Sequence, residues 1–361
     1  MATTTGSQLA TVRRFDGAVG HPLVDQQGRR VNYLRVSVTD RCNYRCTYCM
    51  PEEGVPHADQ AEILDFEEIA ALVGCFVRLG VDRVRLTGGE PTVRKGLVDL
   101  VRRLREIPRL RELSLSTNGH LLAELAAPLR TAGVDRLNVS LDSLDPARFA
   151  EVTRRGELSR VLAGIDAARA AGFAAIKLNV VAVKGFNDDE IGALCDYAFA
   201  RGLVPRFIEQ MPMADGTLFV PGTFFPAAEI RARIEAAFRP ARLRPAPASD
   251  ERGAGPARYW VLEGDKLPSH WASAAPLVGL ITPMTEHFCD SCNRVRLSAA
   301  GKLHACLAYD DAVDLRAALH ADGAPAVEAA IAEALFAKRD RHSFGLVGIG
   351  GPRKAMVQIG G

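Results

Sequence analysis

The chain has 361 residues, of which 48% are hydrophobic and 24% are charged, a composition that is ordinary for a globular protein with a substantial core. Its formal net charge of +2 does not favour a surface that binds nucleic acid, so any phosphate recognition is expected to be local. No run approaches the roughly 18 apolar residues of a membrane span, and the N-terminal residues contain no apolar signal-peptide core. We therefore expect a cytoplasmic protein that binds neither nucleic acid nor a membrane.

The N-terminal part of the chain leads into a loop that is rich in cysteine. Residues 1–21 are polar, small and without periodicity, which predicts a flexible N-terminal arm. Residues 34–39 alternate as a strand, and the loop that follows carries Cys42, Cys46 and Cys49. Three thiols this close can reach one metal centre, and an iron–sulfur cluster held by three thiolates keeps one iron open for another ligand. A disulfide or a set of small core residues fits poorly, because the loop is rich in Arg, Asn and Tyr.

Strands and helices then alternate along the chain. Further strands are predicted at residues 84–87, 113–116, 137–142, 176–181 and 204–209, and helices at residues 66–79, 97–105, 121–132, 160–171 and 188–200. Strands joined by helices pair in parallel, so the pattern indicates an α/β fold with an incomplete (β/α)6 TIM-like barrel at residues 22–220. Such a sheet carries its chemistry at the carboxyl ends of its strands, where the cysteine loop, Gly88, Gly89, Ser116 and Ser140 all fall.

The C-terminal part, residues 221–361, lacks this alternation and is predicted to form a small iron–sulfur domain. It is expected to contain a loop at residues 240–256, strands at residues 259–262, 277–282 and 295–298, helices at residues 227–238, 312–319 and 326–337, and a glycine-rich tail. Cys289, Cys292 and Cys306 form a second group of three thiols. Their spacing suits a zinc site completed by His287 or His304 as well as it suits an iron–sulfur cluster.

Two other cysteines, Cys75 and Cys195, lie singly in apolar helical stretches and are expected to be buried. Two groups of metal-bound thiolates, rather than disulfides, favour a reducing compartment.

Several cationic side chains are predicted to lie inside the sheet. Arg294 and Arg296 lie two apart in a predicted strand beside the second cysteine group, so both can face one anionic ligand. Arg35, Arg85 and Lys177 lie within strands of the predicted barrel, where a charge is costly unless it is paired or contacts a ligand. A solvated basic edge is the alternative for the arginine pair. The pattern favours a polar barrel cavity suited to a polyphosphate.

The motif Cys-x3-Cys-x2-Cys after one strand and Gly-Gly-Glu-Pro after the next closely resemble the radical S-adenosylmethionine (SAM) superfamily. Within it, residues 37–43, 86–91 and 206–209, the second cysteine group with Cys-Asn-Arg-Val-Arg, and the terminal Gly-Gly are similar to the GTP 3′,8-cyclases. That family begins molybdenum cofactor biosynthesis. The resemblance runs from about residue 22 to the end of the chain and leaves only the N-terminal arm uncovered.

The resemblance implies that SAM and two [4Fe-4S] clusters are the cofactors. The first cluster would bind Cys42, Cys46 and Cys49 and would chelate SAM at its open iron, and the second would bind Cys289, Cys292 and Cys306 and the guanine end of GTP. SAM would be cleaved to methionine and a 5′-deoxyadenosyl radical, and this radical would abstract hydrogen from C3′ of GTP. The carbon radical left at C3′ would attack C8 of guanine and give (8S)-3′,8-cyclo-7,8-dihydroguanosine 5′-triphosphate. By the same analogy, SAM contacts Tyr48, Gly89, Ser140 and Met211, and GTP contacts Arg35, Arg85, Ser116, Lys177, Arg294, Val295 and Arg296.

The resemblance also implies a role for the tail and a set of partners. Gly360 and Gly361 would insert toward the active site and be needed for activity, whereas composition alone predicts an ordinary mobile terminus. The expected partners are a reductant such as ferredoxin or flavodoxin, the downstream cyclic pyranopterin monophosphate synthase, and a second copy of the chain in a homodimer. Two rival functions stay open: a radical SAM enzyme with an auxiliary cluster that acts on a peptide, and a non-enzymatic zinc protein or nucleic-acid binder.

Overall fold

The computed structural model describes residues 23–220, 222–247, 249, 253, 255–273, 275–345 and 350–359. The predicted N-terminal arm, residues 1–21, lies outside these ranges. The described residues form a 12-stranded sheet in the order β12-β11-β10-β1-β2-β3-β4-β5-β6-β9-β8-β7. Its middle consists of the six predicted parallel strands in chain order: β1 (Tyr33–Ser37), β2 (Arg83–Thr87), β3 (Glu112–Thr117), β4 (Arg136–Ser140), β5 (Ile176–Ala182) and β6 (Val204–Glu209).

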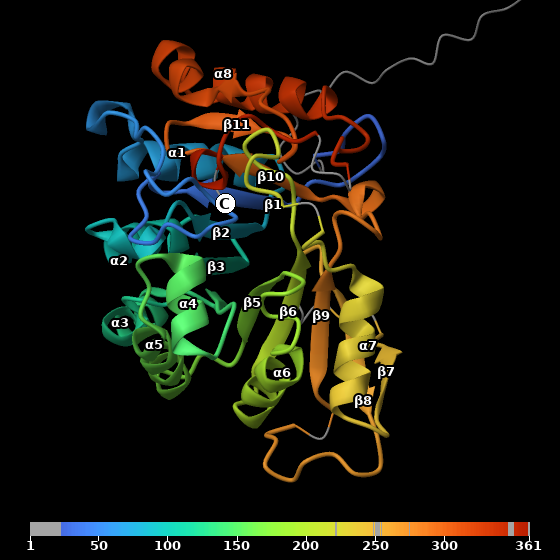
Figure 1. Ribbon diagram of the computed structural model, residues 1–361. Helices are drawn as coiled ribbons and strands as arrows, with labels where there is room; N and C mark the ends of the chain where they lie inside the picture. The colour runs from blue at the N-terminus through green and yellow to red at the C-terminus, as the bar shows by residue number, and fades with distance from the viewer. Residues whose placement is uncertain are drawn as a thin grey trace, which may run out of the picture.

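Helices connect these strands on the outside of the curved sheet, as Figure 1 shows. The five predicted ones are present, with ends that differ by up to three residues: α1 (Phe66–Arg78), α2 (Leu97–Arg105), α3 (Leu122–Ala132), α5 (Leu158–Ala170) and α6 (Ile191–Ala200). Each buries an apolar stripe; in α1 that stripe includes Ile69, Leu72 and Phe76. The start of α1 is sharp because the Asp65 carboxylate accepts from the Glu68 N–H and the Glu68 side chain accepts from the Asp65 N–H.

A further helix, α4 (Pro146–Thr153), was not predicted from the sequence. It follows β4 and begins at Asp145, whose carboxylate accepts from the N–H groups of Ala147 and Arg148. Short 3₁₀ turns at Gln60–Glu62 and Pro91–Val93 complete the connections of this half.

The C-terminal part joins the same sheet at both edges. β10 (Arg294–Leu297) pairs in parallel with β1, and β9 (Leu277–Ile281) pairs in parallel with β6. The outer strands β11 (Lys302–His304), β12 (Val313–Asp314), β8 (Arg258–Glu263) and β7 (Arg242–Pro245) are antiparallel. Within the described residues no pairing joins β12 to β7, so the barrel is open, as predicted. The division into domains at residue 220 stays a prediction.

One local expectation in this part is wrong. β7 lies in residues 240–256, where a loop was expected; its residues are mostly exposed, so the strand has no apolar alternation to reveal it, and it exists because it pairs with β8. The two predicted helices near the C-terminus are present as the two parts of α8 (Leu315–Phe336), which are separated by a kink at Gly323, where the backbone is not helical. The remaining elements are α7 (Ala227–Ala237) and 3₁₀ turns at Cys289–Ser291 and Met356–Gln358.

Candidate active site

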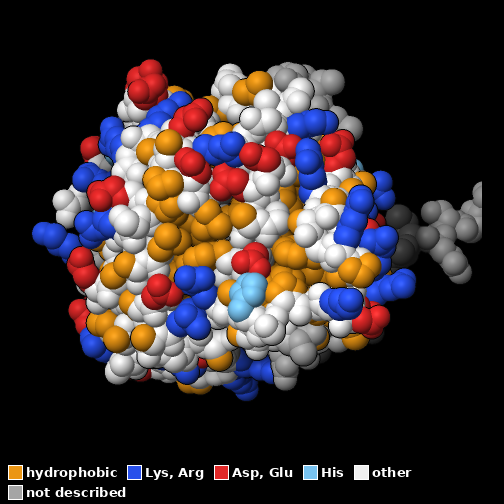
Figure 2. All heavy atoms as spheres, turned by 60° about the horizontal axis from the view of Figure 1, so that its bottom comes forward, with side chains coloured by type: hydrophobic (Ala, Val, Ile, Leu, Met, Phe, Trp, Pro, Cys, Tyr) orange, Lys and Arg blue, Asp and Glu red, His pale blue; other side chains and the backbone are white. Residues whose placement is uncertain are grey.

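A cavity of about 330 Å³ lies at the carboxyl ends of the parallel strands and is lined by both cysteine groups. Most predicted site residues share it: besides the six cysteines, they are Arg35, Tyr48, Gly89, Ser116, Ser140, Met211, Arg294 and Arg296. Figure 2 shows a side of the molecule on which apolar side chains gather within a surround of charged ones. The two cysteine groups, more than two hundred residues apart in the sequence, therefore line the same cavity.

The first cysteine loop is held against the loop that follows β2. The N–H groups of Gly89 and Glu90 donate to the carbonyls of Thr39 and Arg41, both at 2.8 Å. A Cβ on Gly89 would lie 2.3 Å from the carbonyl oxygen of Arg41, and one on Gly88 would lie 2.5 Å from that of Thr39. Glycine is required at both positions because the two backbones touch there.

The thiols of the first group are free and turned into the cavity. Burial raises the pKa of Cys42 to about 11, with the carboxylate of Glu90 adding to the rise, and burial raises the pKa of Cys49 to about 12. Burial also raises the pKa of Cys46. A metal cluster is the partner that turns such thiols into thiolates, so the chemistry of this donor set fits a three-thiolate cluster.

Two carboxylates that the sequence analysis did not select organise this end of the cavity. Glu90 accepts hydrogen bonds from Thr117 Oγ1 at 2.7 Å and the Asn118 N–H at 2.6 Å, and so joins the ends of β2 and β3. Asp142 accepts one from the Tyr48 hydroxyl at 2.6 Å and one from the Val181 N–H at 2.8 Å. Burial raises the pKa of Asp142 to about 6 despite these donors. The available signal was a carboxylate two or three residues beyond the end of a strand, at the active end of the sheet.

The second cysteine group has a different electrostatic setting. Burial alone would raise the pKa of Cys292, but the positive charges of Arg294 and Lys338 outweigh it and lower that pKa to about 6. Within the described ranges, no three His, Cys, Asp or Glu side chains converge as ligands of a single metal ion. His287 Nδ1 lies 2.7 Å from the carbonyl oxygen of Pro283 and 3.1 Å from His342 Nε2, so it contacts backbone and a second histidine. Three thiols that line one cavity beside cationic side chains fit a three-thiolate cluster.

Three arginines lie side by side on the neighbouring strands β10, β1 and β2. Arg35 on β1 is in register with Arg85 on β2 and with Arg296 on β10. Like charges side by side on neighbouring strands repel each other, and burial together with Arg296 and Arg85 holds the pKa of Arg35 well below its usual range. Arg35 Nε is buried and has no hydrogen-bond partner among the described residues. Arg35 and Arg296, which line the cavity, are therefore suited to an anionic ligand.

Three predicted GTP residues do not line the cavity. The Arg85 guanidinium donates to Ser114 Oγ at 3.3 Å and lies 5.3 Å from the Tyr33 ring centre. Lys177 is buried deeper in the barrel, where burial, Arg206 and Arg85 lower its pKa to about 6. Val295 is packed in the core, 1% exposed. Gly360 and Gly361 lie outside the described residues.

Arg206 was missed, although an arginine inside β6 carries the same signal as Arg35 and Arg85. It is 2% exposed, and its Nε donates to Asn179 Oδ1 at 3.0 Å. Burial lowers its pKa. The barrel interior thus holds one more cation than was predicted.

Comparison with known proteins identifies the family. Residues 36–198 match the Radical SAM superfamily and residues 204–344 match Molybdenum Cofactor Synthesis C. The chain is 49% identical to the GTP 3′,8-cyclase of Ectopseudomonas mendocina (strain ymp), over 89% of this chain and 93% of the relative. The chain belongs to the GTP 3′,8-cyclase family. A second member, from Pelotomaculum thermopropionicum, is 46% identical over 93% of this chain and 99% of its own length.

Among solved structures, Streptococcus suis SuiB bound to precursor peptide SuiA is 17% identical with a TM-score of 0.46, over 57% of this chain and 45% of that chain. Family membership confirms the resemblance and the assignment of SAM and two [4Fe-4S] clusters as cofactors of this radical SAM enzyme. It also decides against the peptide-acting and the non-enzymatic hypotheses. No helix among the described residues is long and apolar enough to cross a membrane. The roles of individual site residues stay predictions.

Proposed function

We propose that this chain is a GTP 3′,8-cyclase that converts GTP to (8S)-3′,8-cyclo-7,8-dihydroguanosine 5′-triphosphate, in the first step of molybdenum cofactor biosynthesis. SAM is cleaved to methionine and 5′-deoxyadenosine in the reaction. The observation that supports this proposal is the single cavity into which both cysteine groups and the cations Arg35, Arg294 and Arg296 open. Its relatives of that name match almost the full chain.

The cysteines divide into two ligand sets. Cys42, Cys46 and Cys49 are proposed to hold the first cluster, and the set Cys289, Cys292 and Cys306 to hold the second. When bound, the clusters supply the electron that cleaves SAM and an open iron for the guanine of GTP.

SAM is proposed to lie beside the first group, against Tyr48, Gly89, Ser140 and Met211. The contribution of this chain there is orientation. The hydrogen bond to Asp142 fixes the Tyr48 ring, and the contact between backbones at Gly89 fixes the loop.

GTP is proposed to lie on the other side of the cavity. Arg294 and Arg296 present guanidinium groups to the triphosphate, and Arg35 offers a buried donor without a partner among the described residues. Arg85 lies deeper in the barrel and adds positive potential, and Ser116 adds a hydroxyl. Lys177 also lies deeper, and because its pKa is lowered to about 6 it would gain its charge when an anion binds. Apolar side chains such as Phe288 and Met213 keep water from the reacting centre.

The tail is proposed to enter the active site at Gly360 and Gly361. Support comes from the residues just before them, since Met356 and Val357 line the cavity. Val357 also packs with Met50 beside Cys49, and its N–H favours the Cys49 thiolate. Two glycines placed next would reach a crowded centre without side chains of their own.

The finer partners remain part of the proposal. They are a ferredoxin or flavodoxin as reductant, the downstream cyclic pyranopterin monophosphate synthase, and a second copy of the chain in a homodimer. The proposed location is the cytoplasm. A low-potential electron carrier is needed because the first cluster must be reduced before each turnover.

One experiment tests the proposed function. The protein is reconstituted anaerobically, iron and sulfide are counted, and SAM, GTP and a reductant are added. About eight irons per chain, as two cubane clusters require, together with 5′-deoxyadenosine and a cyclised nucleotide, are expected. Zinc without labile sulfide, or SAM cleavage with no nucleotide product, would overturn the proposal.

A further inference from the structure

Lys338 is a buried lysine that the proposed reaction leaves without a role. It lies two residues beyond the end of α8 and is 4% exposed, whereas lysine side chains normally reach solvent. Its Nζ donates to the carbonyl oxygens of Arg294 at 2.8 Å and Ala305 at 2.6 Å, and lies 3.6 Å from Cys292 Sγ. Burying a cation is costly unless its donors are used, and here all three donors have an acceptor.

These acceptors belong to the two separate segments that carry the second cysteine group. One acceptor is Cys292 itself, and the Arg294 carbonyl lies two residues beyond it. The Ala305 carbonyl belongs to the residue immediately before Cys306. A single ammonium group therefore joins the segments of two proposed cluster ligands.

A second cation holds the same region from the N-terminal side. Arg29 donates to the carbonyl of Cys289 at 2.9 Å and to that of Asp340 at 2.8 Å. Its own charge is paired with Asp25, at 2.6 Å. Lys338 is thus linked to Cys292 and to the residue before Cys306, and the Arg29 side chain bridges the carbonyls of Asp340 and Cys289.

The first cysteine group has the opposite surroundings. Burial is the largest cause of the raised pKa of Cys42, and the carboxylate of Glu90 is the next. For Cys46, burial, the neighbouring thiols and the carboxylate of Asp142 raise the pKa. The charged groups that act most strongly on Cys292 are Arg294 and Lys338. The two cluster sites of one cavity therefore differ in the sign of the charge beside their sulfurs.

We propose that Lys338 is a positioning residue for the second cluster: it fixes the Cys292 and Cys306 segments, and its N–H···S contact raises the reduction potential of that cluster. Adding an electron makes an iron–sulfur cluster more negative, so hydrogen bonds and positive charge at its sulfurs stabilise the reduced state. The inference rests on the proposed function, because it assumes that the second cysteine group holds a [4Fe-4S] cluster.

The test uses the full chain, reconstituted anaerobically, as Lys338→Met, which removes charge and donor, and Lys338→Gln, which keeps a donor. Lys302→Met is the matched control, since Lys302 lies on β11 in the same region and its exposed ammonium group pairs with Asp314 on the surface. Iron and sulfide are counted, and both clusters are titrated with a reductant while their electron paramagnetic resonance (EPR) signals are followed.

In Lys338→Met, we expect the midpoint potential of the second cluster to shift to a more negative value, or half the iron to be lost, with the signal of the first cluster unchanged. Lys338→Gln is expected to fall between Lys338→Met and the wild type, and Lys302→Met is expected to match the wild type. Full iron with an unshifted second cluster in Lys338→Met would overturn the assignment, as would an equal shift of both clusters. If Lys338→Met does not fold, a wild-type potential in Lys338→Gln overturns it. A wild-type protein with one cluster would instead refute the proposed function.

Discussion

Replacing Arg294 by alanine tests how GTP recognition is separated from SAM cleavage. The Arg294 guanidinium lines the cavity, lies 5.1 Å from the Phe288 ring centre, and comes two residues after Cys292. The alanine variant keeps the backbone carbonyl that accepts from Lys338, so the packing of this segment is retained. The lost interaction is that of one guanidinium with a triphosphate.

The size of the effect follows from the type of contact. A hydrogen bond to a charged group contributes about 1.5–3 kcal/mol, and 1.4 kcal/mol corresponds to a tenfold change in affinity. Arg294 is partly exposed, which favours the lower half of that range. We expect the dissociation constant for GTP to rise roughly 10- to 50-fold. Slow cleavage of SAM without GTP should continue, because the first cysteine group is untouched.

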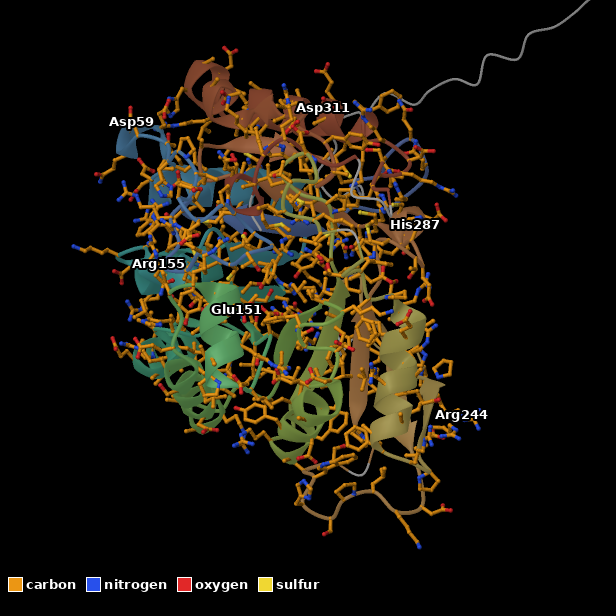
Figure 3. All side chains as sticks on the ribbon, in the orientation of Figure 1. Asp59, Glu151, Arg155, Arg244, His287 and Asp311 are labelled. Atoms are coloured by element: carbon orange, nitrogen blue, oxygen red, sulfur yellow. The ribbon has the colours of Figure 1, made fainter. Side chains whose placement is uncertain are left out.

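The assay compares GTP binding and 5′-deoxyadenosine formation in wild type and variant. The iron content of each protein is verified first, because the charge of Arg294 also lowers the pKa of Cys292, a proposed cluster ligand. Arg244→Ala is the matched control. Arg244 lies on the exposed edge strand β7, and Figure 3 shows it well away from His287, which is close to Cys289 in the chain. Loss of GTP-independent SAM cleavage in Arg294→Ala at full iron content would refute the division of labour. Unchanged GTP affinity would refute the phosphate contact.

Three further predictions concern the first cysteine group and the tail. Gly89→Ala places a Cβ 2.3 Å from the Arg41 carbonyl oxygen, so we expect loss of SAM binding with the second cluster retained, measured by equilibrium dialysis and EPR; wild-type SAM affinity would contradict this. Because the pKa of Asp142 is raised from 3.8 to about 6 in the fold, its contribution to stability is present below pH 3.8 and is lost as pH rises through about 6. Urea unfolding of the metal-free chain should therefore show a fall of at most ~2–3 kcal/mol over that window, and Asp142→Asn should remove it; an equal fall in both proteins would count against the raised pKa. Deleting Gly360 and Gly361 should abolish cyclisation while iron content stays full, and retained product would argue against the role of the tail.

Local pattern was enough to predict the middle of this fold. The alternation of residues 34–39 and the apolar stripe of residues 66–79 reveal β1 and α1, because a strand or helix that packs on a core shows its own period in the sequence. The spacing of Cys42, Cys46 and Cys49 likewise indicated a metal centre, since its ligands come from one short loop. The family resemblance rested on the same local motifs.

The sequence by itself therefore determined the strand and helix order, the two cysteine groups and the cations inside strands. Only the tertiary structure decided how they meet. β10 lies beside β1, which brings Arg296 into register with Arg35 and places the second cysteine group across the cavity from the first. The role of Lys338 could not be read from its neighbours in the chain, because its acceptors lie more than thirty residues away. Pairing between distant segments depends on the packing of the whole sheet, and no short stretch of sequence contains that information.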